Sequence, residues 1–358
     1  MSATQVSATQ AALPLFDNAQ AWTGPEMAAR TDWIHALDAD EVAELRAAVA
    51  TAMATGRPVQ ALTRADFPLD RLAARLDAIR HEVLHGRGFF LMRGVPVGEW
   101  SLAESAAAFW GMGLVLGEPV SQNGKGHVLG HVANLGLDYG DPEVRGYQTS
   151  AHLNYHTDSS DVVGLLSLRT PKSGGLSSIV SSTTLWNRLA AERPDLARAL
   201  LEPFPYTRWG EVPEGRDPWF GMPVFTPWQG RMIGAYVGSA VRKAQRLPGV
   251  PPLSAAQQEA MAALDALAGD PALRLDMDFR PGDVQWLCNH GILHSRTAYE
   301  DWPEPARRRH LLRLWLACPD GPALPPAFTD TYQGRTETGR PDGIRVPGVP
   351  LHAPLEPA

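Results

Sequence analysis

Short runs of β-forming residues dominate the chain from about residue 127 onward, and Gly, Pro and Asn separate one run from the next. The 358 residues include 33 Gly and 31 Pro, a share well above the usual ~12%. Because such residues end regular elements, the long strand–helix alternation of a doubly wound sheet is not favoured. The pattern predicts a mainly β fold with peripheral helices around a sandwich or barrel core. The β-type runs lie at 161–169, 176–182, 223–226, 230–237, 283–288 and 309–317.

Helical periodicity is clearest before this β-rich region. Two segments repeat apolar side chains at the spacing of one helix face, and Gly86 and Gly88 end the second of them. Residues 89–94 are typical of a short buried strand. Helices are predicted at about 40–53, 69–85, 102–112, 184–201 and 254–268.

The charge balance excludes several classes of protein. The chain has 39 Asp and Glu against 32 Lys and Arg and no basic run, so nucleic-acid binding is not expected. No apolar run approaches the ~18 residues of a membrane span, and the first residues lack the features of a signal peptide, so a cytoplasmic protein is expected. Two cysteines, Cys288 and Cys318, are too few for a disulfide framework or a Cys-rich zinc site. A homo-oligomer is compatible with the sequence.

Histidines gather in two clusters, and each contains the pattern His-x-x-x-His. His152 and His156 form the first pair, and His290 and His294 the second. On a helix this spacing can bind zinc, but the Glu that the zinc-protease motif needs after its first His is missing from both. On a strand, residues four apart lie roughly 13 Å from each other. Only one His of each pair would then reach a common ion.

The first cluster also places an acid close to a histidine. His156 and Asp158 are two residues apart, so on an extended segment both side chains leave the same face. A third ligand from a distant strand would complete a two-His-one-carboxylate triad, which is typical of non-haem Fe(II) oxygenases. Alone, the pattern is equally compatible with a loop histidine beside a solvated acid.

Arginines follow the second cluster in a strand-like segment. If residues 309–317 form a strand, Arg309 and Arg313 share a face. The planar guanidinium group binds a carboxylate with two parallel hydrogen bonds, which lysine cannot match. The other interpretation is a solvated basic patch, and it is expected to hold for Arg307 or Arg308.

In combination, these motifs resemble a known family. His156-x-Asp158, then His294 after 135 intervening residues, then Arg309 fifteen residues later, is similar to the taurine dioxygenase and clavaminate synthase-like superfamily. These are Fe(II)/2-oxoglutarate oxygenases with a distorted double-stranded β-helix (jelly-roll, cupin-like) core. The resemblance runs from about residue 88 to 316. It includes the segments Tyr155-His-Thr-Asp-Ser-Ser-Asp, Ser173-Gly-Gly-Leu-Ser-Ser, Pro281-Gly-Asp-Val-Gln, Leu293-His-Ser-Arg-Thr-Ala-Tyr and Arg308-Arg-His-Leu-Leu-Arg-Leu-Trp.

The resemblance implies a role for each matching residue. His156, Asp158 and His294 would be the catalytic Fe(II) ligands. Arg309 would pair with the distal carboxylate of 2-oxoglutarate, and Ser177 would add a hydroxyl where relatives commonly have Thr. Arg313 would face the substrate or the other end of the cosubstrate. Further substrate contacts are expected from Asn154, Tyr155, His152, Arg313 and Arg242, each of which also has a purely structural interpretation.

The implied reaction uses O2 to oxidise an aliphatic C–H of a small acidic or amino-acid-like molecule, with release of succinate and CO2. Hydroxylation is the usual outcome, and desaturation or ring closure are variants. Two other classes remain open: a catalytically silent cupin-like binding protein, and a metal-dependent isomerase or hydrolase on the same barrel.

The expected domain organisation is simple. Residues 1–25 are expected to form a flexible tail, and residues 26–318 a single catalytic β-helix domain with N-terminal helices and an insertion at 184–270. Residues 319–358 would form a Pro-rich C-terminal extension.

Overall fold

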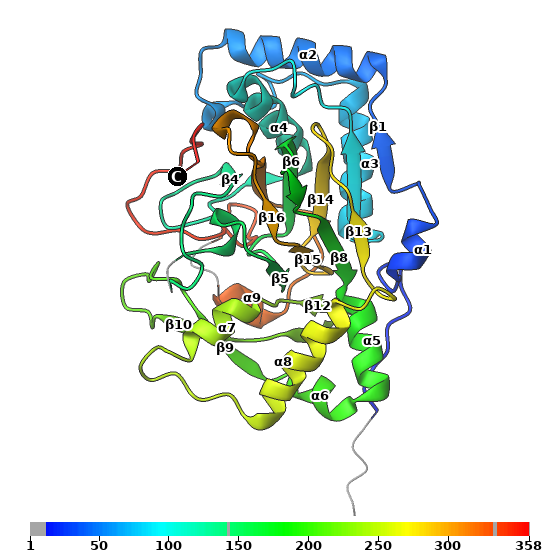
Figure 1. Ribbon diagram of the computed structural model, residues 1–358, viewed down its shortest axis with the longest axis vertical. Helices are drawn as coiled ribbons and strands as arrows, with labels where there is room; N and C mark the ends of the chain where they lie inside the picture. Colours follow the sequence, from blue (N-terminus) through cyan, green and yellow to red (C-terminus); the bar gives the residue numbers. More distant parts are fainter. Residues whose placement is uncertain (1–11, 142–143, 332–334, 358) are drawn as a thin grey trace, which may run out of the picture.

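The computed structural model describes residues 12–141, 144–331 and 335–357. Its centre is a larger sheet in the order β1-β2-β14-β6-β17-β3, with β4 also paired to β17 (Figure 1). β1 and β2 are parallel, and the other neighbours in this sheet are antiparallel. The strands are β1 (Ile34–Ala36), β2 (Phe89–Arg93), β3 (Glu118–Pro119), β4 (Gly130–Val132), β6 (Val162–Arg169), β14 (Val284–Cys288) and β17 (His310–Ala317).

A smaller antiparallel sheet carries the order β13-β8-β15-β5. Its strands are β5 (Leu153–His156), β8 (Ser177–Ser181), β13 (Leu275–Met277) and β15 (Ile292–Arg296). β8, β15 and β17 are wholly buried, so none of them shows a half-exposed alternation, and β15 and β17 bury polar side chains that include His294, Arg296 and Arg313.

Side chains alternate across the larger sheet, so its two faces bury different cores. Leu312, Leu314 and Leu316 of β17 join a cluster with the N-terminal helices. Trp315, from the opposite face of the same strand, belongs to a cluster that includes Ile179 of the smaller sheet. The region between the two sheets is therefore where inward-pointing polar residues of both can meet.

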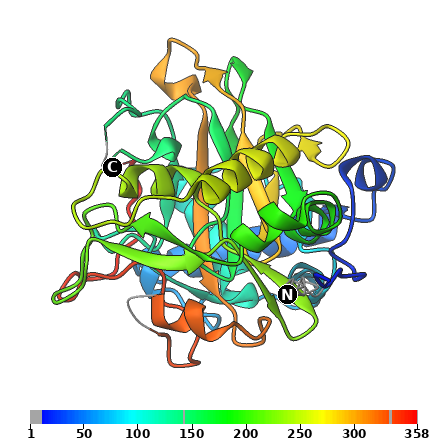
Figure 2. The same ribbon diagram turned by 90° about the horizontal axis from the view of Figure 1, so that it is seen from below.

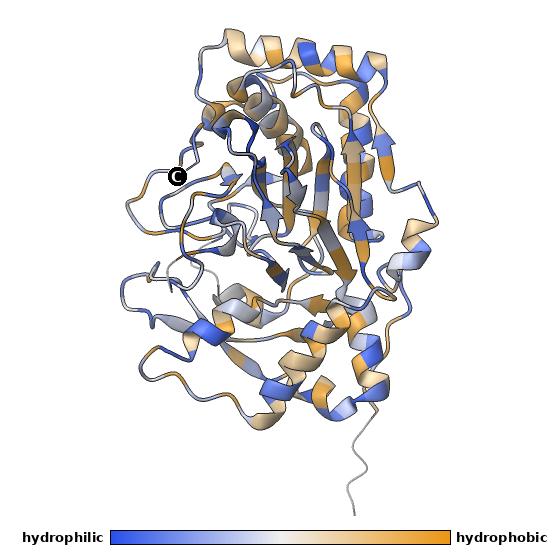
Figure 3. Ribbon diagram, viewed as in Figure 1, coloured by the Kyte–Doolittle hydropathy of each residue, from blue (hydrophilic) through white to orange (hydrophobic). Residues whose placement is uncertain are grey.

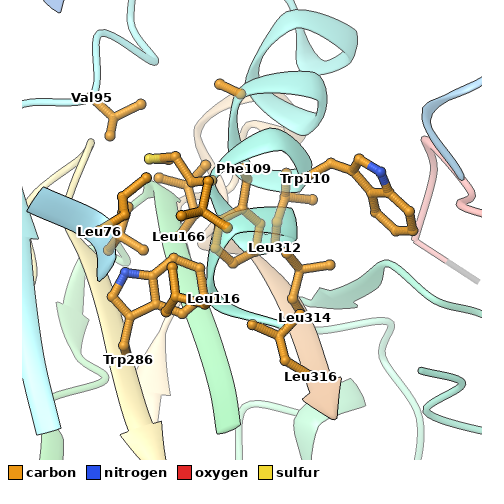
Figure 4. Packing of buried hydrophobic residues seen from close by; sticks show 14 of the residues in the cluster. Leu76, Val95, Phe109, Trp110, Leu116, Leu166, Trp286, Leu312, Leu314 and Leu316 are labelled. Atoms are coloured by element: carbon orange, nitrogen blue, oxygen red, sulfur yellow. The ribbon is translucent and has the colours of Figure 1, made fainter. Parts of the chain in front are cut away.

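Helices α3 (Arg71–His85) and α4 (Leu102–Leu116) pack on the outer face of the larger sheet, and α2 (Ala39–Ala54) packs against both of them. Reciprocal capping boxes start α2 at Asp38 and α4 at Ser101. Figure 4 shows Phe109 of α4 above Trp286 and Leu312, and the Phe109 and Trp286 rings are 5.5 Å apart. In Figure 3, α2 and α3 carry both hydrophilic and hydrophobic residues, as helices with one buried face do.

The insertion forms the opposite end of the molecule from α2 (Figures 1 and 2). The predicted helix at 184–201 is divided at Arg193, because Pro194 disfavours helical backbone in the residue before it. A separate apolar cluster holds the insertion together and joins it to Tyr155, Val180 and Leu293 of the smaller sheet. Its elements are α5 (Ser182–Glu192), α6 (Pro194–Ala199), β9 (Pro203–Thr207), β10 (Trp219–Pro223), β11 (Phe225–Trp228), β12 (Arg231–Gly234), α7 (Gly238–Ala244) and α8 (Ala255–Ala268).

Both terminal segments contact the body of the protein. Residues 12–23, expected in a flexible tail, are anchored because Trp22 buries its ring and donates to the carbonyl of Arg87 (2.8 Å); residues 1–11 lie outside the described residues. In the C-terminal extension, Arg340 forms a buried ion pair with Asp161. The remaining short elements are α1 (Gly24–Ala28), η1 (Val59–Ala61), η2 (Gly146–Gln148), β7 (Ser173–Gly174), β16 (Tyr299–Glu300), η3 (Pro305–Arg307) and α9 (Pro326–Thr331).

The secondary-structure content corrects the prediction of a mainly β fold. Helices account for 30% and strands for 24%, so the protein has mixed α and β content. The prediction missed the extent of α4 and the presence of α7, since both are rich in small residues without a clear apolar stripe. None of the helices in the described ranges has the length and apolar character of a membrane-spanning segment.

Candidate metal centre

Three of the predicted side chains converge between the two sheets. His156 ends β5, Asp158 follows it in a loop, and His294 lies on β15 directly opposite His156 in the strand register. One ligand atom from each lies within 4.8 Å of the other two. The two imidazole rings are 4.2 Å apart, and His294 Nε2 lies 3.9 Å from Asp158 Oδ2. Two nitrogens and one carboxylate oxygen form a donor set that suits Fe(II).

Neighbouring groups orient two members of this His-Asp-His triad, Asp158 and His156. The backbone N–H of Asp158 donates to Asn289 Oδ1 (3.0 Å), and Trp315 Nε1 donates to Asp158 Oδ2 (2.9 Å). His156 Nδ1 donates to the carbonyl of Asn154 (2.8 Å). That hydrogen bond fixes the neutral tautomer in which Nε2 carries a lone pair, the form that binds a metal.

The protonation states also suit a metal. Burial lowers the pKa of His156, and burial together with the charge of His156 lowers the pKa of His294 to about 3. Burial alone would raise the pKa of Asp158, but the charge of Arg313, followed by those of both histidines, lowers it. At neutral pH the site therefore presents two neutral imidazoles and one carboxylate, with no proton to displace.

A cavity adjoins the triad on the side of β8 and β17. Ser177, Arg309, Leu311 and Arg313 line it together with His294. Arg309, Leu311 and Arg313 point to one side, as the strand alternation predicts, although Arg309 itself precedes β17. The guanidinium of Arg309 is buried, and its Nη1 has no hydrogen-bond partner among the described residues. A buried guanidinium that keeps a donor available in this way suits the binding of an anion.

Arg313 lies nearer the triad than Arg309 does. Its Nε donates to Gln122 Oε1 (2.8 Å), and its Nη1 lies 3.4 Å from Asp158 Oδ2. Its guanidinium also stacks over the ring of Tyr147, 4.5 Å from the centroid. Asp158 therefore has a basic neighbour on one side, and Arg313 is held by three groups at once.

A second cavity opens onto the triad from the side of the loop before β5. His156, Asp158, Asn154 and Arg313 line its inner end. Several aromatic residues from distant segments also line it: Tyr139, Tyr147, Trp209 and Trp315, together with Arg145 and Ile344. A small molecule in this cavity would lie next to the metal ligands.

Some predicted residues lie elsewhere. Arg242 pairs with Asp265 of α8 at 2.5 Å and does not line the cavity at the triad, because that acid holds it on the insertion surface. His152 is exposed and lines a separate hollow. His290 donates to Asp161 (2.7 Å) and is not part of the triad. Tyr155 lines the second cavity, but its hydroxyl bonds to Ser178.

The sequence interpretation missed several residues around the triad. Gln122 contacts Arg313, Trp315 contacts Asp158, and Arg296 lines the cavity on the side of β8 and β17. The alternation of side chains along a strand could have identified two of them, Arg296 and Trp315. Arg296 shares a face with His294, and Trp315 shares one with Arg313. No local pattern in the sequence distinguishes Gln122.

Comparison with known proteins gives a consistent result. The family model described as "Taurine catabolism dioxygenase TauD, TfdA family" matches residues 55–315. FR-33289 synthase of Streptomyces rubellomurinus is 28% identical over 327 residues, covering 89% of this chain and 95% of that protein. Taurine hydroxylase-like protein SAT17 of Stachybotrys chartarum is 28% identical over 307 residues, covering 82% of this chain and 77% of the relative.

Solved structures are similar in fold. Asparagine oxygenase in complex with Fe(II), a hydroxyasparagine and succinate superposes with a TM-score of 0.62 at 19% identity, covering 80% of this chain and 93% of the other. The non-heme iron oxygenase OrfP with Fe gives 0.60 at 15% identity, covering 87% and 99%. OrfP is also known with Fe and alpha-ketoglutaric acid (TM-score 0.55, 18% identity, covering 79% of this chain and 94% of that one).

Proposed function

Because the chain belongs to the TauD/TfdA family of Fe(II)/2-oxoglutarate dioxygenases, we propose that it hydroxylates an aliphatic C–H of a small acidic or amino-acid-like molecule. The observation that carries the proposal is the His-Asp-His triad between an arginine-lined cavity and a second cavity with several aromatic residues in its wall. The first cavity suits the cosubstrate and the second suits the substrate.

His156, Asp158 and His294 would hold the iron. When bound, Fe(II) supplies the activation of O2, coupled to oxidative decarboxylation of 2-oxoglutarate to succinate and CO2. The chain's own contribution is to keep both imidazoles neutral and the carboxylate ionised. Trp315 and Arg313 hold that carboxylate in place, and Asn289 accepts a hydrogen bond from the backbone N–H of Asp158.

Arg309 and Ser177 would bind the distal carboxylate of 2-oxoglutarate. Both are buried and line the same cavity, and Arg309 Nη1, which has no partner in the described part of the chain, can donate to a carboxylate oxygen there. Arg313 would stay with Asp158 and face the region between cosubstrate and substrate.

The substrate would enter the aromatic cavity, with Asn154 and Tyr155 in its wall. Relatives of similar fold support an amino-acid-like molecule, since one is an asparagine oxygenase and OrfP was solved with (3S)-hydroxy-L-Arg (TM-score 0.58, 17% identity, covering 79% of this chain and 94% of that one). The aromatic rings would exclude water from the reacting C–H.

The proposal extends to the architecture. The larger and smaller sheets would together form a distorted double-stranded β-helix, and residues 26–318 would act as one catalytic unit with the insertion as part of the substrate wall. Trp209 of the insertion lines the substrate cavity, which supports this arrangement.

The test is an anaerobic titration of the protein with Fe(II) and 2-oxoglutarate, followed by a succinate assay in air. A charge-transfer absorption band and slow succinate release without substrate are expected, and both should be lost in His294→Ala. A band without any succinate release would favour a silent binding protein. The absence of both would contradict the proposed activity and leave a metal-dependent isomerase or hydrolase as the alternative. A panel of L-amino acids scored by stimulated succinate release would then identify the substrate class.

A further inference from the structure

Arg296 is a buried arginine beside the triad for which neither the family match nor the proposed function has a role. It lies on β15 two residues after His294, so the two side chains leave the strand on the same face. In the strand register it lies opposite Ser177 of β8. Side chains directly opposite each other in an antiparallel pair are neighbours, with Cβ atoms about 5 Å apart.

The guanidinium of Arg296 is only partly satisfied. Its Nη2 donates to the carbonyls of Thr149 (3.2 Å) and Ala151. Its Nε and Nη1 are buried and have no hydrogen-bond partner within the described part of the chain, and the whole residue is 4% exposed. Leaving such donors unpaired in a site without water is costly, so a ligand that accepts from them is favoured.

The guanidinium of Arg309 is also buried with a donor, Nη1, that has no hydrogen-bond partner among the described residues. The two guanidinium groups lie 4.6 and 5.1 Å from the centroid of the same ring, that of Tyr299. Asp301 accepts from the backbone N–H of Arg309 (2.7 Å) rather than from its guanidinium. No ion pair in the described ranges joins either guanidinium to a carboxylate.

Two buried cations beside one cavity repel each other. Burial, followed by the charge of Arg309, lowers the pKa of Arg296 to about 10. The repulsion is relieved when an anion lies between the two groups, because each then gains a charge-assisted hydrogen bond. Ser177, Arg296 and Arg309 all line the cavity in which that anion would be held.

We propose that Arg296 is a second arginine for the distal carboxylate of 2-oxoglutarate, which it shares with Arg309 and Ser177. This inference rests on the proposed function. It makes Arg296 a determinant of cosubstrate choice, favouring a 2-oxo acid with a second carboxylate over one with an uncharged end. The competing interpretation is that Arg296 only tethers residues 149–151 through their carbonyls.

The test compares two cosubstrates in anaerobic titrations of the Fe(II)-loaded protein, read by the charge-transfer band. The first is 2-oxoglutarate, and the second is 2-oxopentanoate, which has the same chain with a methyl group in place of the distal carboxylate. In Arg296→Gln the Kd for 2-oxoglutarate should rise by about 10- to 100-fold, since a hydrogen-bonded charge is lost. The Kd for 2-oxopentanoate should change less than about twofold.

Two further variants make the result interpretable. Arg242→Gln removes an arginine paired with Asp265 away from the cavity and should leave both Kd values unchanged. Arg296→Lys keeps the charge without the planar donor pair, so its affinity for 2-oxoglutarate should be intermediate, with no change for 2-oxopentanoate. This variant replaces Arg296→Gln in the comparison if the Gln variant does not fold. Equal losses for both ligands, or no loss for either, would overturn the assignment and leave a tethering role. No band in the wild type with either ligand would instead contradict the proposed function.

Discussion

At the scale of single residues, the environment of Asp158 explains how a buried carboxylate stays ready for a metal. Its backbone N–H and its Oδ2 are both hydrogen-bonded, and a guanidinium lies 3.4 Å away. Groups that orient a metal ligand affect metal binding without touching the metal. Trp315 is the clearest case, because its indole N–H contacts the carboxylate directly.

Replacing this donor should weaken iron binding specifically. Trp315→Phe keeps an aromatic ring but removes the hydrogen bond to Asp158, so the affinity for Fe(II) should fall by about tenfold or more. Anaerobic Fe(II) titration would measure it. Trp286→Phe is the matched control: its ring is fully buried and its Nε1 has no hydrogen-bond partner among the described residues, so stability should fall while Fe(II) affinity stays unchanged. Equal Fe(II) affinity in Trp315→Phe and the wild type would contradict the orienting role.

At the scale of elements, a series of hydrogen bonds between side chains links β6, β17 and β4 to the C-terminal extension. Arg169 Nη2 donates to His310 Nδ1 (3.2 Å), His310 Nε2 lies 2.7 Å from His131 Nδ1, and His131 Nε2 donates to the carbonyl of Pro354 (2.8 Å). Each imidazole must be neutral, with one donor and one acceptor nitrogen, for all three contacts to form. A proton on either ring would place two donors face to face.

This series of hydrogen bonds predicts that the free energy of unfolding decreases in acid. Burial, followed by the charge of His131, lowers the pKa of His310 to about 3, and the pKa of His131 is also lowered. Between the ordinary histidine pKa of about 6.5 and that lowered value, the unfolded state binds more protons than the folded state, so stability falls as pH falls.

The His310→Gln variant isolates the effect. From pH 7 to pH 5 the wild type should lose about 1 to 2 kcal/mol more unfolding free energy than the variant does, measured by urea denaturation at each pH. The exposed His81→Gln serves as a control with the wild-type pH dependence. If the unfolding free energies of the wild type and of His310→Gln fell in parallel with pH, the His131–His310 pair would not be the source of the acid sensitivity.

At the scale of the whole molecule, the C-terminal extension packs against the rest of the protein through buried polar contacts. Arg340 donates from Nε to Asp161 Oδ2 (2.8 Å), and the same carboxylate accepts from His290 and from the backbone N–H of Cys318. Asp161 is completely buried and lies three residues after Asp158. Ile344, a few residues beyond Arg340, lines the proposed substrate cavity.

Removing the arginine should therefore destabilise the whole protein. Arg340→Met leaves the Asp161 charge buried without its guanidinium partner, which should cost about 3 to 5 kcal/mol of unfolding free energy. Urea denaturation at pH 7 would measure the loss. Arg345→Met, which breaks the more exposed pair with Asp342, should cost less than about 1 kcal/mol. Similar losses for the two variants would contradict a special role for the Arg340–Asp161 pair.

The sequence predicted the main strands and the faces they present. β6, β8, β14 and β17 begin and end within two residues of the predicted runs. Such patterns are local, because the direction of a side chain on a strand depends only on its position in the alternation. The helices were less well predicted. The predicted helix at 184–201 is two helices, and the fold has mixed α and β content where the sequence predicted a mainly β fold. Short elements such as α7 depend on packing within the insertion rather than on their own periodicity.

By itself, the sequence determined which residue types could bind iron and a carboxylate, since spacing and side-chain chemistry are properties of the chain. Only the tertiary structure decided which of them meet. It brought His294 opposite His156 and placed Arg313 in contact with Asp158 and Gln122. Among the described residues it also left donors of Arg296 and Arg309 without a partner beside one cavity. It also gave Arg242 an acid partner on α8. Partners far apart in sequence are selected by long-range packing, and no local pattern contains that information.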